Sequence, residues 1–344
     1  MTSLVVQTAF LGDVVLTTPL LEALAAKHGP VDVVTTPAAA PLLETHAAVH
    51  RVIPYDKRGR ERGLAGLLRL ARALKAERYD VAYLPHRSLR TAALAWLARV
   101  PTRVGFDDGW PLFYTQVRRR PREGHESDRL LALADVAPQR ARPSLHVSIA
   151  DRAGTEGFLR AHAIHEPLVA LAPGSIWGSK RWPYYKELAE RLAERTAIVV
   201  VGGPEDAALG EEIVRAVEGG GVGRGGKGER SRAVNACGRL TLRQSVDIIR
   251  RATVLVTNDS APLHFAQAMG TPTVAIFGST VPAFGFGPRG PRDAIVELTG
   301  LPCRPCSAHG PPSCPLGHHR CMKSLTVADV LHAIEETGAL HRRD

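Results

Sequence analysis

Short apolar runs alternate along the chain with longer segments of helical periodicity, and in the first half this alternation predicts a parallel sheet. The predicted strands are residues 4–8, 31–35, 51–55, 80–84 and 103–106. The predicted helices are residues 13–28, 61–77 and 88–98. Strands separated by helices are typical of right-handed crossovers between parallel strands.

The same alternation starts again after a helical segment near 151–162. The second set of predicted strands is 167–173, 196–203, 252–259 and 271–278, and the helices are 183–195, 204–217, 241–251 and 260–269. These strands are continuous apolar runs, as expected for strands buried on both faces. The pattern predicts an α/β protein of two doubly wound sheets facing a cleft, with the boundary near the AIHEP segment, 163–167. The expected domains are therefore 1–165 and 166–344.

Length and composition agree with two ordinary globular domains. The chain has 344 residues, of which 44% are hydrophobic and 23% charged, and no apolar run reaches the eighteen or so residues that a membrane span needs. The apolar N-terminus lacks a basic region and is interrupted by Gln7 and Asp13, so we expect no signal peptide. These features predict a cytoplasmic protein.

A formal charge of +10 indicates either an anionic partner or a solvated basic surface. Residues 1–165 contain 23 Lys and Arg against 16 Asp and Glu, so most of the excess lies in the first half. Aromatic residues make up 5% of the chain, and no known nucleic-acid-binding module is visible, so we expect no nucleic-acid partner. The Gly/Arg-rich segment 218–232 is interpreted as a surface loop, because nothing places its glycines at a phosphate-binding turn.

The stretch QTAFLGDVVLTTPLLEAL, residues 7–24, places Asp13 in the loop between the first predicted strand and its helix. Asp13 could cap the helix, or act as a general base, because ligands of parallel sheets bind at such loops. A dinucleotide fingerprint would need three spaced glycines, and this loop has only Gly12. The sequence therefore argues against a nicotinamide oxidoreductase.

Two loops of the second half combine groups that suit a nucleotide diphosphate. PGSIWGSKRWP, residues 173–183, offers the hydroxyls of Ser175 and Ser179 and the cation of Lys180, although it could also be a solvated loop with packing tryptophans. In VTNDSAPLHFAQAMG, residues 256–270, a strand ends before a helix whose N-terminal amides suit a pyrophosphate. His264 on that helix is either structural or part of the pocket.

A third turn, VVGGPEDA at residues 200–207, carries an acid that could bind ribose hydroxyls or cap its helix. That acid is Glu205. Gly202 and Gly203 would allow the backbone to approach a ligand closely.

Together these segments resemble glycosyltransferase family 9, the heptosyltransferases of lipopolysaccharide core assembly, and within it the heptosyltransferase II subgroup. The resemblance rests on FLGDVVLTTPLLEAL, the PGS…KRWP loop, the VGGPED turn and NDSAPLHFAQAMGTPTVAIFGST. It implies a GT-B fold of two Rossmann-like domains, with the acceptor in the first and the donor nucleotide in the second. It also implies inverting transfer of heptose from ADP-heptose to the heptosyl-Kdo2-lipid A core.

The resemblance assigns roles to individual residues. Asp13 matches the catalytic base, Lys180 the phosphate-contacting lysine, Ser175 a phosphate-binding hydroxyl and Glu205 the ribose-binding acid. The other implied donor-site residues are Leu240 near adenine, Asp259 facing the sugar, Ser260 and Ala261 donating amides to the pyrophosphate, and His264 lining the pocket. Where the family has a second hydroxyl beside Ser175, this chain has Ile176, so the phosphate contacts differ in detail.

The implied partners are an ADP-heptose donor and an anionic lipid acceptor at the inner face of the cytoplasmic membrane. Two basic segments, 57–62 and 118–122, are candidates for holding the acceptor and the anionic leaflet, or are merely solvated. Alternatives to the second heptosyltransferase are the first, which acts on Kdo2-lipid A, and a non-catalytic nucleotide-sugar-binding protein. No cofactor is expected to be required.

Four of the five cysteines lie in one segment, Cys303, Cys306, Cys314 and Cys321, spaced C-x2-C-x7-C-x6-C with histidines nearby. The ligand types suit zinc or an iron–sulfur cluster, but the spacing matches neither a standard zinc finger nor a ferredoxin. We therefore favour reduced thiols or a disulfide over a metal at this cluster. Cys237, alone after a predicted strand, is expected in the core.

Overall fold

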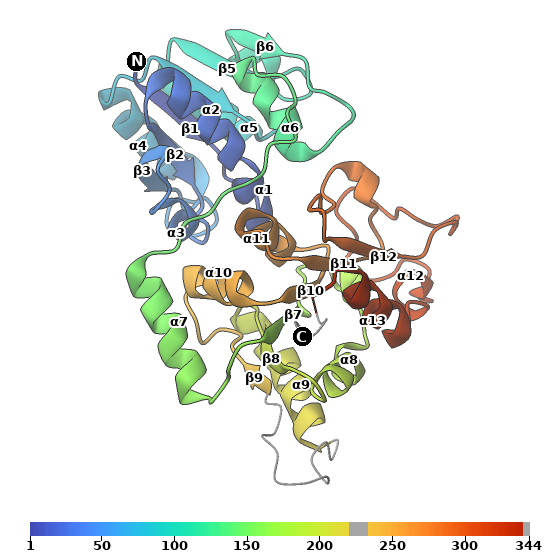
Figure 1. The fold of residues 1–344 in the computed structure, drawn as a ribbon. Helices are drawn as coiled ribbons and strands as arrows, with labels where there is room; N and C mark the ends of the chain where they lie inside the picture. Colours follow the sequence, from blue (N-terminus) through green and yellow to red (C-terminus); the bar gives the residue numbers. More distant parts are fainter. Residues whose placement is uncertain (220–232, 340–344) are drawn as a thin grey trace. The chain divides into compact units, whose positions relative to one another are not determined.

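The structure is a computed structural model that describes residues 1–219 and 233–339. The chain divides into two compact units, Met1–His146 (unit 1) and Val147–Asp344 (unit 2), and each is built on one six-stranded parallel sheet (Figure 1). The predicted α/β class is confirmed. The boundary predicted near 163–167 lies beyond helix α7 (Ile149–Ala161), which groups with unit 2, and the position of the domain boundary stays a prediction.

Unit 1 has the strand order β3–β2–β1–β4–β5–β6. Its strands are β1 (Ser3–Val6), β2 (Val31–Thr35), β3 (Val49–Pro54), β4 (Val81–Leu84), β5 (Thr102–Phe106) and β6 (Gln116–Arg118). Its helices are α1 (Leu11–Leu16), α2 (Thr18–His28), α3 (Ala40–Leu43), α4 (Gly63–Ala76), α5 (Leu89–Leu97) and α6 (Glu126–Leu131), with 3-10 turns η1 (Pro111–Phe113) and η2 (Ala132–Ala134).

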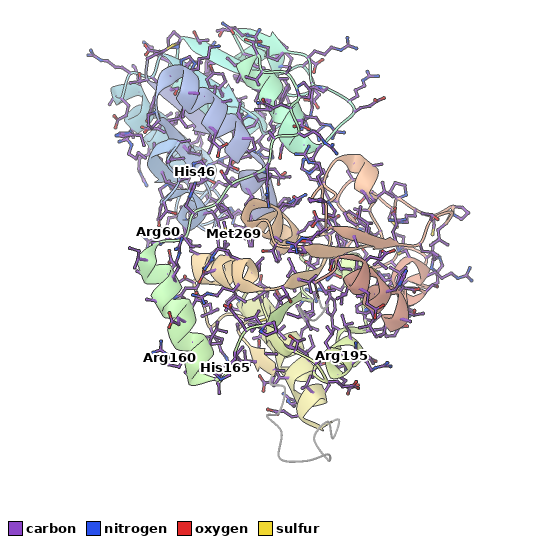
Figure 2. The ribbon with its side chains drawn as sticks, viewed as in Figure 1. His46, Arg60, Arg160, His165, Arg195 and Met269 are labelled. Carbon is purple, nitrogen blue, oxygen red and sulfur yellow. The ribbon has the colours of Figure 1, made fainter. Side chains whose placement is uncertain are left out.

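Alternating side chains of the unit 1 strands pack in two layers. Leu4 and Val6 of β1 join a cluster with α4 and α5 on one face, while Val5 joins a cluster with α2 and α6 on the other. His46, labelled in Figure 2, is buried in this unit. Its Nε2 lies 2.9 Å from Oγ of Ser144, which is close to the last residue of the unit. The sheet is thus covered on both faces, as its apolar strands predict.

Unit 2 has the strand order β12–β11–β10–β7–β8–β9. Its strands are β7 (Leu168–Ala172), β8 (Ala197–Val200), β9 (Ala233–Asn235), β10 (Val254–Asn258), β11 (Thr273–Phe277) and β12 (Ala294–Glu297). Besides α7, its helices are α8 (Tyr185–Leu192), α9 (Ala207–Gly219), α10 (Leu242–Arg251), α11 (Ala261–Met269), α12 (Arg320–Lys323) and α13 (Val327–Glu336). Three 3-10 turns, η3 (Gly178–Lys180), η4 (Pro204–Asp206) and η5 (Pro282–Phe284), follow strand ends.

The core of unit 2 lies mainly between the sheet and helices α8, α9 and α13. Val169, Leu171 and their neighbours on the other strands point into this layer, where Cys237 is also buried, as predicted. On the other face, Leu263 of α11 packs against Ala275 and Phe277 of β11. Helix α10 lies beside α11 and also packs on α7 (Figure 1).

Several elements differ from the sequence-based prediction. The helix predicted at 13–28 is two helices, because Thr17 ends α1 and Pro19 occupies the first turn of α2. The edge strands β6, β9 and β12 were not predicted, since they are only three or four residues long. Residues 220–232 of the predicted surface loop lie outside the described residues. Within the described part of the chain, no helix is both long and apolar enough to cross a membrane.

Candidate functional site

The predicted site residues follow the central strands of each sheet. Strand order reverses between β1 and β4 in unit 1 and between β7 and β10 in unit 2. In doubly wound sheets, ligands bind beyond the carboxyl ends of the strands at this reversal. Asp13 follows β1, residues 173–183 follow β7, and residues 259–264 follow β10.

Asp13 is the third residue of α1 and is half-buried. Its Oδ2 accepts a hydrogen bond from the backbone N–H of Phe10 at 3.1 Å, which is the helix-capping interaction that the sequence left open. Burial and the nearby carboxylate of Glu126 raise the pKa of Asp13 to about 6. Such a carboxylate is ionised at neutral pH and is a stronger base than an ordinary Asp. The capping and base roles are therefore compatible.

A lysine is fixed beside the loop that carries Asp13. Lys57 Nζ donates to the carbonyl oxygen of Thr8 at 2.7 Å and lies 3.1 Å from the Thr8 hydroxyl. Burial lowers the pKa of Lys57. These bonds join the loop after β3 to the loop after β1, so a cation of the first basic segment lies at the carboxyl edge of the sheet.

The second basic segment, 118–122, is partly engaged inside unit 1. Arg118 pairs with Asp135 at 2.6 Å, and Arg120 hydrogen-bonds the buried Glu126 while its guanidinium lies 4.8 Å from the centre of the Phe106 ring. Arg120 also acts on Asp13. Its positive charge lowers the pKa of Asp13 and so partly offsets the increase caused by the negative charge of Glu126. This segment therefore contributes to the environment of Asp13.

In unit 2, the loop after β7 is anchored as well as exposed. Trp182 is buried in the core and donates from Nε1 to the Leu325 carbonyl at 2.8 Å. Arg181 Nε donates to the Ser175 carbonyl at 2.9 Å, and the Ser175 hydroxyl accepts from the amide of Trp177 at 3.3 Å. Trp182 packs in the core, as the alternative interpretation of this stretch expected, whereas Ser175 is buried and not solvated.

Lys180 and Asp259 form an ion pair, with Nζ 2.6 Å from Oδ2 and both side chains about 10% exposed. Thr280 donates its hydroxyl to the same carboxylate oxygen at 2.6 Å. Asn258 holds the arrangement, since its Oδ1 accepts from the Trp182 amide at 3.1 Å and its Nδ2 donates to the Pro173 carbonyl at 2.8 Å. The structure therefore brings together two residues that the sequence placed in separate motifs.

Helix α11 begins at this ion pair. Ser260 is its N-cap residue, Ala261 its first helical residue, and no side chain caps the helix end. The N-terminal amides and the positive end of the helix dipole are a favourable environment for a phosphate. His264 is buried, its Nδ1 lies 3.0 Å from Gln267 Oε1, and burial lowers its pKa, so the imidazole is neutral at physiological pH.

Glu205 and Asp206 of η4 have different environments. Glu205 is exposed, whereas Asp206 is buried, accepts from the amide of Gly203 at 3.2 Å, and has a pKa raised by burial. The capping role that the sequence offered for Glu205 therefore belongs to Asp206. Leu240 is half-buried in a neighbouring turn, which is joined to this one by the hydrogen bond from the Gly238 amide to the Gly202 carbonyl at 3.2 Å.

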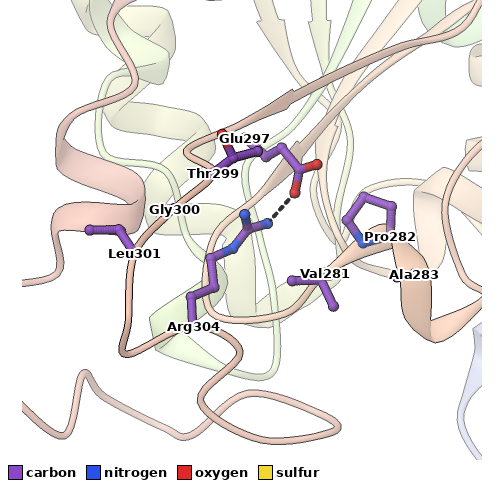
Figure 3. A pocket seen from close by; sticks show the side chains of 8 residues that line it. All are labelled: Val281, Pro282, Ala283, Glu297, Thr299, Gly300, Leu301 and Arg304. Carbon is purple, nitrogen blue, oxygen red and sulfur yellow. Dashed lines mark hydrogen bonds and ion pairs between the residues drawn. The ribbon is translucent and has the colours of Figure 1, made fainter.

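The cysteine-rich segment packs against the loops of the Lys180 site. Ser179 donates to the Pro311 carbonyl at 2.5 Å, and His319 Nε2 lies 2.9 Å from the Ser179 carbonyl oxygen. Arg304 donates to the carbonyls of residues 278 and 280 and to Glu297, beside a shallow pocket of about 280 Å³ (Figure 3). This segment therefore supports the backbone that carries Lys180 and Thr280.

All five cysteines are free. Cys303 Sγ lies 3.9 Å from His318 Nε2, and the Cys314 sulfur accepts from the amide of His319 at 3.4 Å. Backbone N–H groups hold the pKa of Cys314 below its usual range, whereas burial raises that of Cys321 to about 11. Among the residues that the structure describes, no three potential ligands are grouped to hold a metal ion.

Comparison with known proteins decides what kind of protein has this arrangement. The family model of glycosyltransferase family 9 (heptosyltransferase) matches residues 67–313, well over half of the chain. The chain belongs to glycosyltransferase family 9. It is therefore a glycosyltransferase, and the resemblance inferred from its motifs is confirmed.

Individual relatives agree with this family. The transferase is 27% identical over 303 residues to lipopolysaccharide heptosyltransferase 2 of Salmonella typhimurium, covering 82% of this chain and 84% of that protein. It is 29% identical over 326 residues to lipopolysaccharide heptosyltransferase 1 of Pseudomonas aeruginosa, covering 88% and 85%. The solved structure of E. coli ADP-heptose LPS heptosyltransferase II superposes with a TM-score of 0.78 at 25% identity, covering 98% of each chain. The GT-B architecture is thereby confirmed.

Sequence reasoning missed several residues around the Lys180 site of this family 9 transferase. They are Asn258, Thr280, Arg304 and His319, all of which orient the loops or the ion pair. Thr280 lies in the loop after β11, as Asp259 lies in the loop after β10. Because ligands of parallel sheets bind beyond the carboxyl ends of the strands, its position in the sequence could have identified it as a candidate. Arg304 and His319 lie in a segment without periodicity, and only the folded chain shows what they contact.

Proposed function

We propose that this glycosyltransferase transfers L-glycero-D-manno-heptose from ADP-heptose, with inversion at the anomeric carbon, to the heptosyl-Kdo2-lipid A core of lipopolysaccharide. The observation that carries the proposal is the Lys180–Asp259 pair at the N-terminus of α11, where a cation and free helix amides lie together at the carboxyl edge of the sheet. The names of the relatives support heptose as the sugar and lipopolysaccharide as the product.

In the proposed donor complex, Lys180 and the backbone amides of Ser260 and Ala261 bind the diphosphate. Asp259, released from Lys180, faces the sugar, while Glu205 binds the ribose hydroxyls. The remaining contacts are Ser175 at the phosphates, Leu240 at adenine and neutral His264 in the pocket wall. Growing negative charge on the departing ADP is then stabilised by a fixed cation and oriented amides, which act without reorganisation.

Asp13 is the proposed general base. It removes the proton from the acceptor hydroxyl as that oxygen attacks the anomeric carbon from the face opposite ADP. Its pKa of about 6 suits this role, because it is ionised at pH 7 and yet basic enough to accept a proton in the transition state. No metal is required in this proposal, since Lys180 and the helix N-terminus take over stabilisation of the leaving group.

The proposal places the enzyme in the cytoplasm, at the inner face of the cytoplasmic membrane, where a lipid-linked acceptor is accessible. Family membership sets aside the non-catalytic nucleotide-sugar-binding alternative. Heptosyltransferase I activity on Kdo2-lipid A remains the second candidate, because the similarity to the heptosyltransferase 1 of Pseudomonas aeruginosa extends over most of the chain.

The test measures ADP release from ADP-heptose by the purified protein with Kdo2-lipid A or its mono-heptosylated form as acceptor. We expect turnover only on the heptosylated acceptor. Turnover on Kdo2-lipid A alone would assign the first heptose instead. Failure with both acceptors, while ADP still binds, would show that the acceptor is wrongly identified.

Two variants separate the proposed roles. Asp13→Ala should lower kcat by about 100-fold or more and leave ADP affinity unchanged, because a general base acts only on the acceptor proton. Lys180→Met should weaken ADP binding as well as turnover. An Asp13→Ala enzyme with normal turnover would remove Asp13 from the mechanism.

A further inference from the structure

One face of unit 1 combines exposed apolar side chains with a basic helix. Helices α4 and α5 pack on the same side of the sheet, and Phe113 of η1 joins their hydrophobic cluster. Trp96 at the end of α5 meets Phe113 edge to face, with ring centroids 6.0 Å apart. The elements α4, α5 and η1 therefore form one continuous surface, called here the α4–α5–η1 face.

Large apolar side chains are exposed on this face. Leu112 of η1 is 90% exposed and Trp96 is 52% exposed. The others are Leu64 at the start of α4, Leu89 at the start of α5, and Trp110 before η1. Exposed leucines scattered singly need no explanation, but two tryptophans and three leucines on neighbouring elements mark an interaction surface.

The charge of this face is mostly positive. Residues 57–76 contain seven Lys and Arg against a single acid, Glu61, and neither α4 nor α5 contains any Asp or Glu. Arg69, Arg72 and Lys75 are exposed along α4. A surface with basic side chains beside aromatic and aliphatic ones matches an anionic bilayer, whose headgroups attract the cations and whose interface accepts tryptophan.

We infer that the α4–α5–η1 face docks on an anionic lipid bilayer, with Trp96 and Leu112 entering the interface and the α4 cations contacting headgroup phosphates. The inference deepens the proposed function, because an enzyme with a lipid-linked acceptor gains by residing on the surface that contains it. A nucleic acid is a less suitable partner, because its charged phosphate backbone would not bury the apolar side chains of Leu64 and Leu112. The unbalanced positive charge also fits an anionic layer better than a protein surface of mixed charge.

The docking face is connected to the catalytic edge of unit 1. The loop that leads into α4 begins after β3 and contains Lys57, whose Nζ is bonded to Thr8 in the loop before Asp13. Two basic residues of this loop are exposed, Arg58 and Arg60. Arg60 is labelled in Figure 2. An acceptor drawn from the bilayer would meet this loop between the lipid surface and Asp13.

The first measurement is co-sedimentation of the full-length protein with vesicles of phosphatidylcholine, with and without phosphatidylglycerol. We expect at least tenfold tighter binding to the anionic vesicles, reduced by salt because the attraction to headgroups is screened. Equal binding to both vesicles, binding to neither, or binding to an oligonucleotide in place of vesicles would overturn the inference.

Variants then locate the binding. Trp96→Ser combined with Leu112→Ser should lower partition onto anionic vesicles at least tenfold, and Arg69→Glu combined with Arg72→Glu should do the same. Ile149→Ser is the matched control, since Ile149 is 87% exposed on α7 of unit 2 and should not matter. Unchanged binding by both face variants, or an equal loss in the control, would contradict the assignment.

Transfer to a deacylated acceptor separates this inference from the proposed function. The face variants should release ADP at the wild-type rate with this acceptor, because it needs no membrane, and this also shows that they are folded. A loss of transfer equal to the loss of vesicle binding would instead place the face in acceptor binding and overturn the docking role. An inactive wild-type protein that still binds anionic vesicles through this face would refute the transferase proposal alone.

Discussion

Asp13 is held in a position where its ionised form, which the proposed role as a base requires, is energetically unfavourable. Burial and the charge of Glu126 disfavour the carboxylate, while the Phe10 amide and Arg120 favour it, and the balance raises the pKa to about 6. In an unfolded chain an Asp titrates near 4. The ionised Asp13 therefore destabilises the folded state, which agrees with the proposed role because catalytic groups commonly have this property.

The pH dependence of Asp13→Asn tests this argument. Because the folded pKa lies above the unfolded one, the stability that Asp13 contributes is complete below about pH 4 and is lost as pH rises through about 6. Asparagine cannot ionise, so Asp13→Asn should raise the free energy of unfolding by about 1 kcal/mol at pH 8, a figure reduced for partial solvent exposure. Near pH 4 the two proteins should be equally stable in urea denaturation.

The ionisation of Asp13 should affect activity and stability in opposite ways, because deprotonation lowers the stability of the fold but produces the form that acts as a base. Wild-type kcat/KM should fall as pH drops through about 6, because the protonated carboxyl cannot accept the acceptor proton. A pH–rate profile measured with saturating donor checks this. A rate that stays constant down to about pH 5 would mean that Asp13 is not the base.

At the scale of elements, the loops at the carboxyl ends of β7, β8 and β10 are fixed by contacts with one another. Gly174 illustrates this, since a Cβ on it would lie 2.2 Å from Oδ2 of the buried Asp206 on η4. Asp206 in turn accepts from the Gly203 amide. The glycine thus allows two loops of the proposed donor site to approach closely.

Gly174→Ala should therefore push Asp206 away from Gly203 and lower the free energy of unfolding by about 1–3 kcal/mol. We also expect weaker ADP binding, because the displaced loop carries Ser175 and Lys180. Gly157→Ala is the control: Gly157 lies inside α7 with open space around it, so alanine should stabilise by about 0.5–1 kcal/mol. Chemical denaturation and calorimetry of ADP binding measure both effects, and equal behaviour of the two variants would contradict the close approach.

On the scale of the whole molecule, the charges are distributed unevenly between the units. Unit 1 contains 21 Lys and Arg against 14 Asp and Glu, which leaves +7 of the total formal charge of +10 in the unit that we expect to bind the acceptor. Some of this charge is neutralised locally by pairs such as Arg118–Asp135. The remainder favours an acceptor that carries phosphates and carboxylates.

Salt should accordingly weaken acceptor binding. From about 0.1 M to about 1 M salt the screening length falls from about 10 Å to about 3 Å, so the KM for a deacylated acceptor should rise several-fold. Steady-state ADP release at saturating donor measures this without any membrane. An acceptor KM independent of salt would mean that the charge of unit 1 serves another purpose.

The fold was largely predictable because its signals are local. Apolar runs such as LVALA of β7 and TVAIF of β11 are buried on both faces, and a strand covered by helices on both sides requires such a run. The edge strand β6, with the sequence QVR, has no such requirement and was missed. The division of the helix at Thr17 was missed because the apolar periodicity continues across it.

Local patterns along the chain were sufficient to establish the α/β class, the family and the loops that bear Asp13, Lys180 and Asp259, because each depends on short segments with their own periodicity or motif. The folded chain was needed to show that Lys180 pairs with Asp259, that Asp206 rather than Glu205 caps η4, and that the cysteine-rich segment supports Ser179. The first and third of these contacts join residues far apart in the chain, and the second depends on which of two neighbouring carboxylates is buried. Their geometry arises from the packing of strands and helices, which no local pattern encodes.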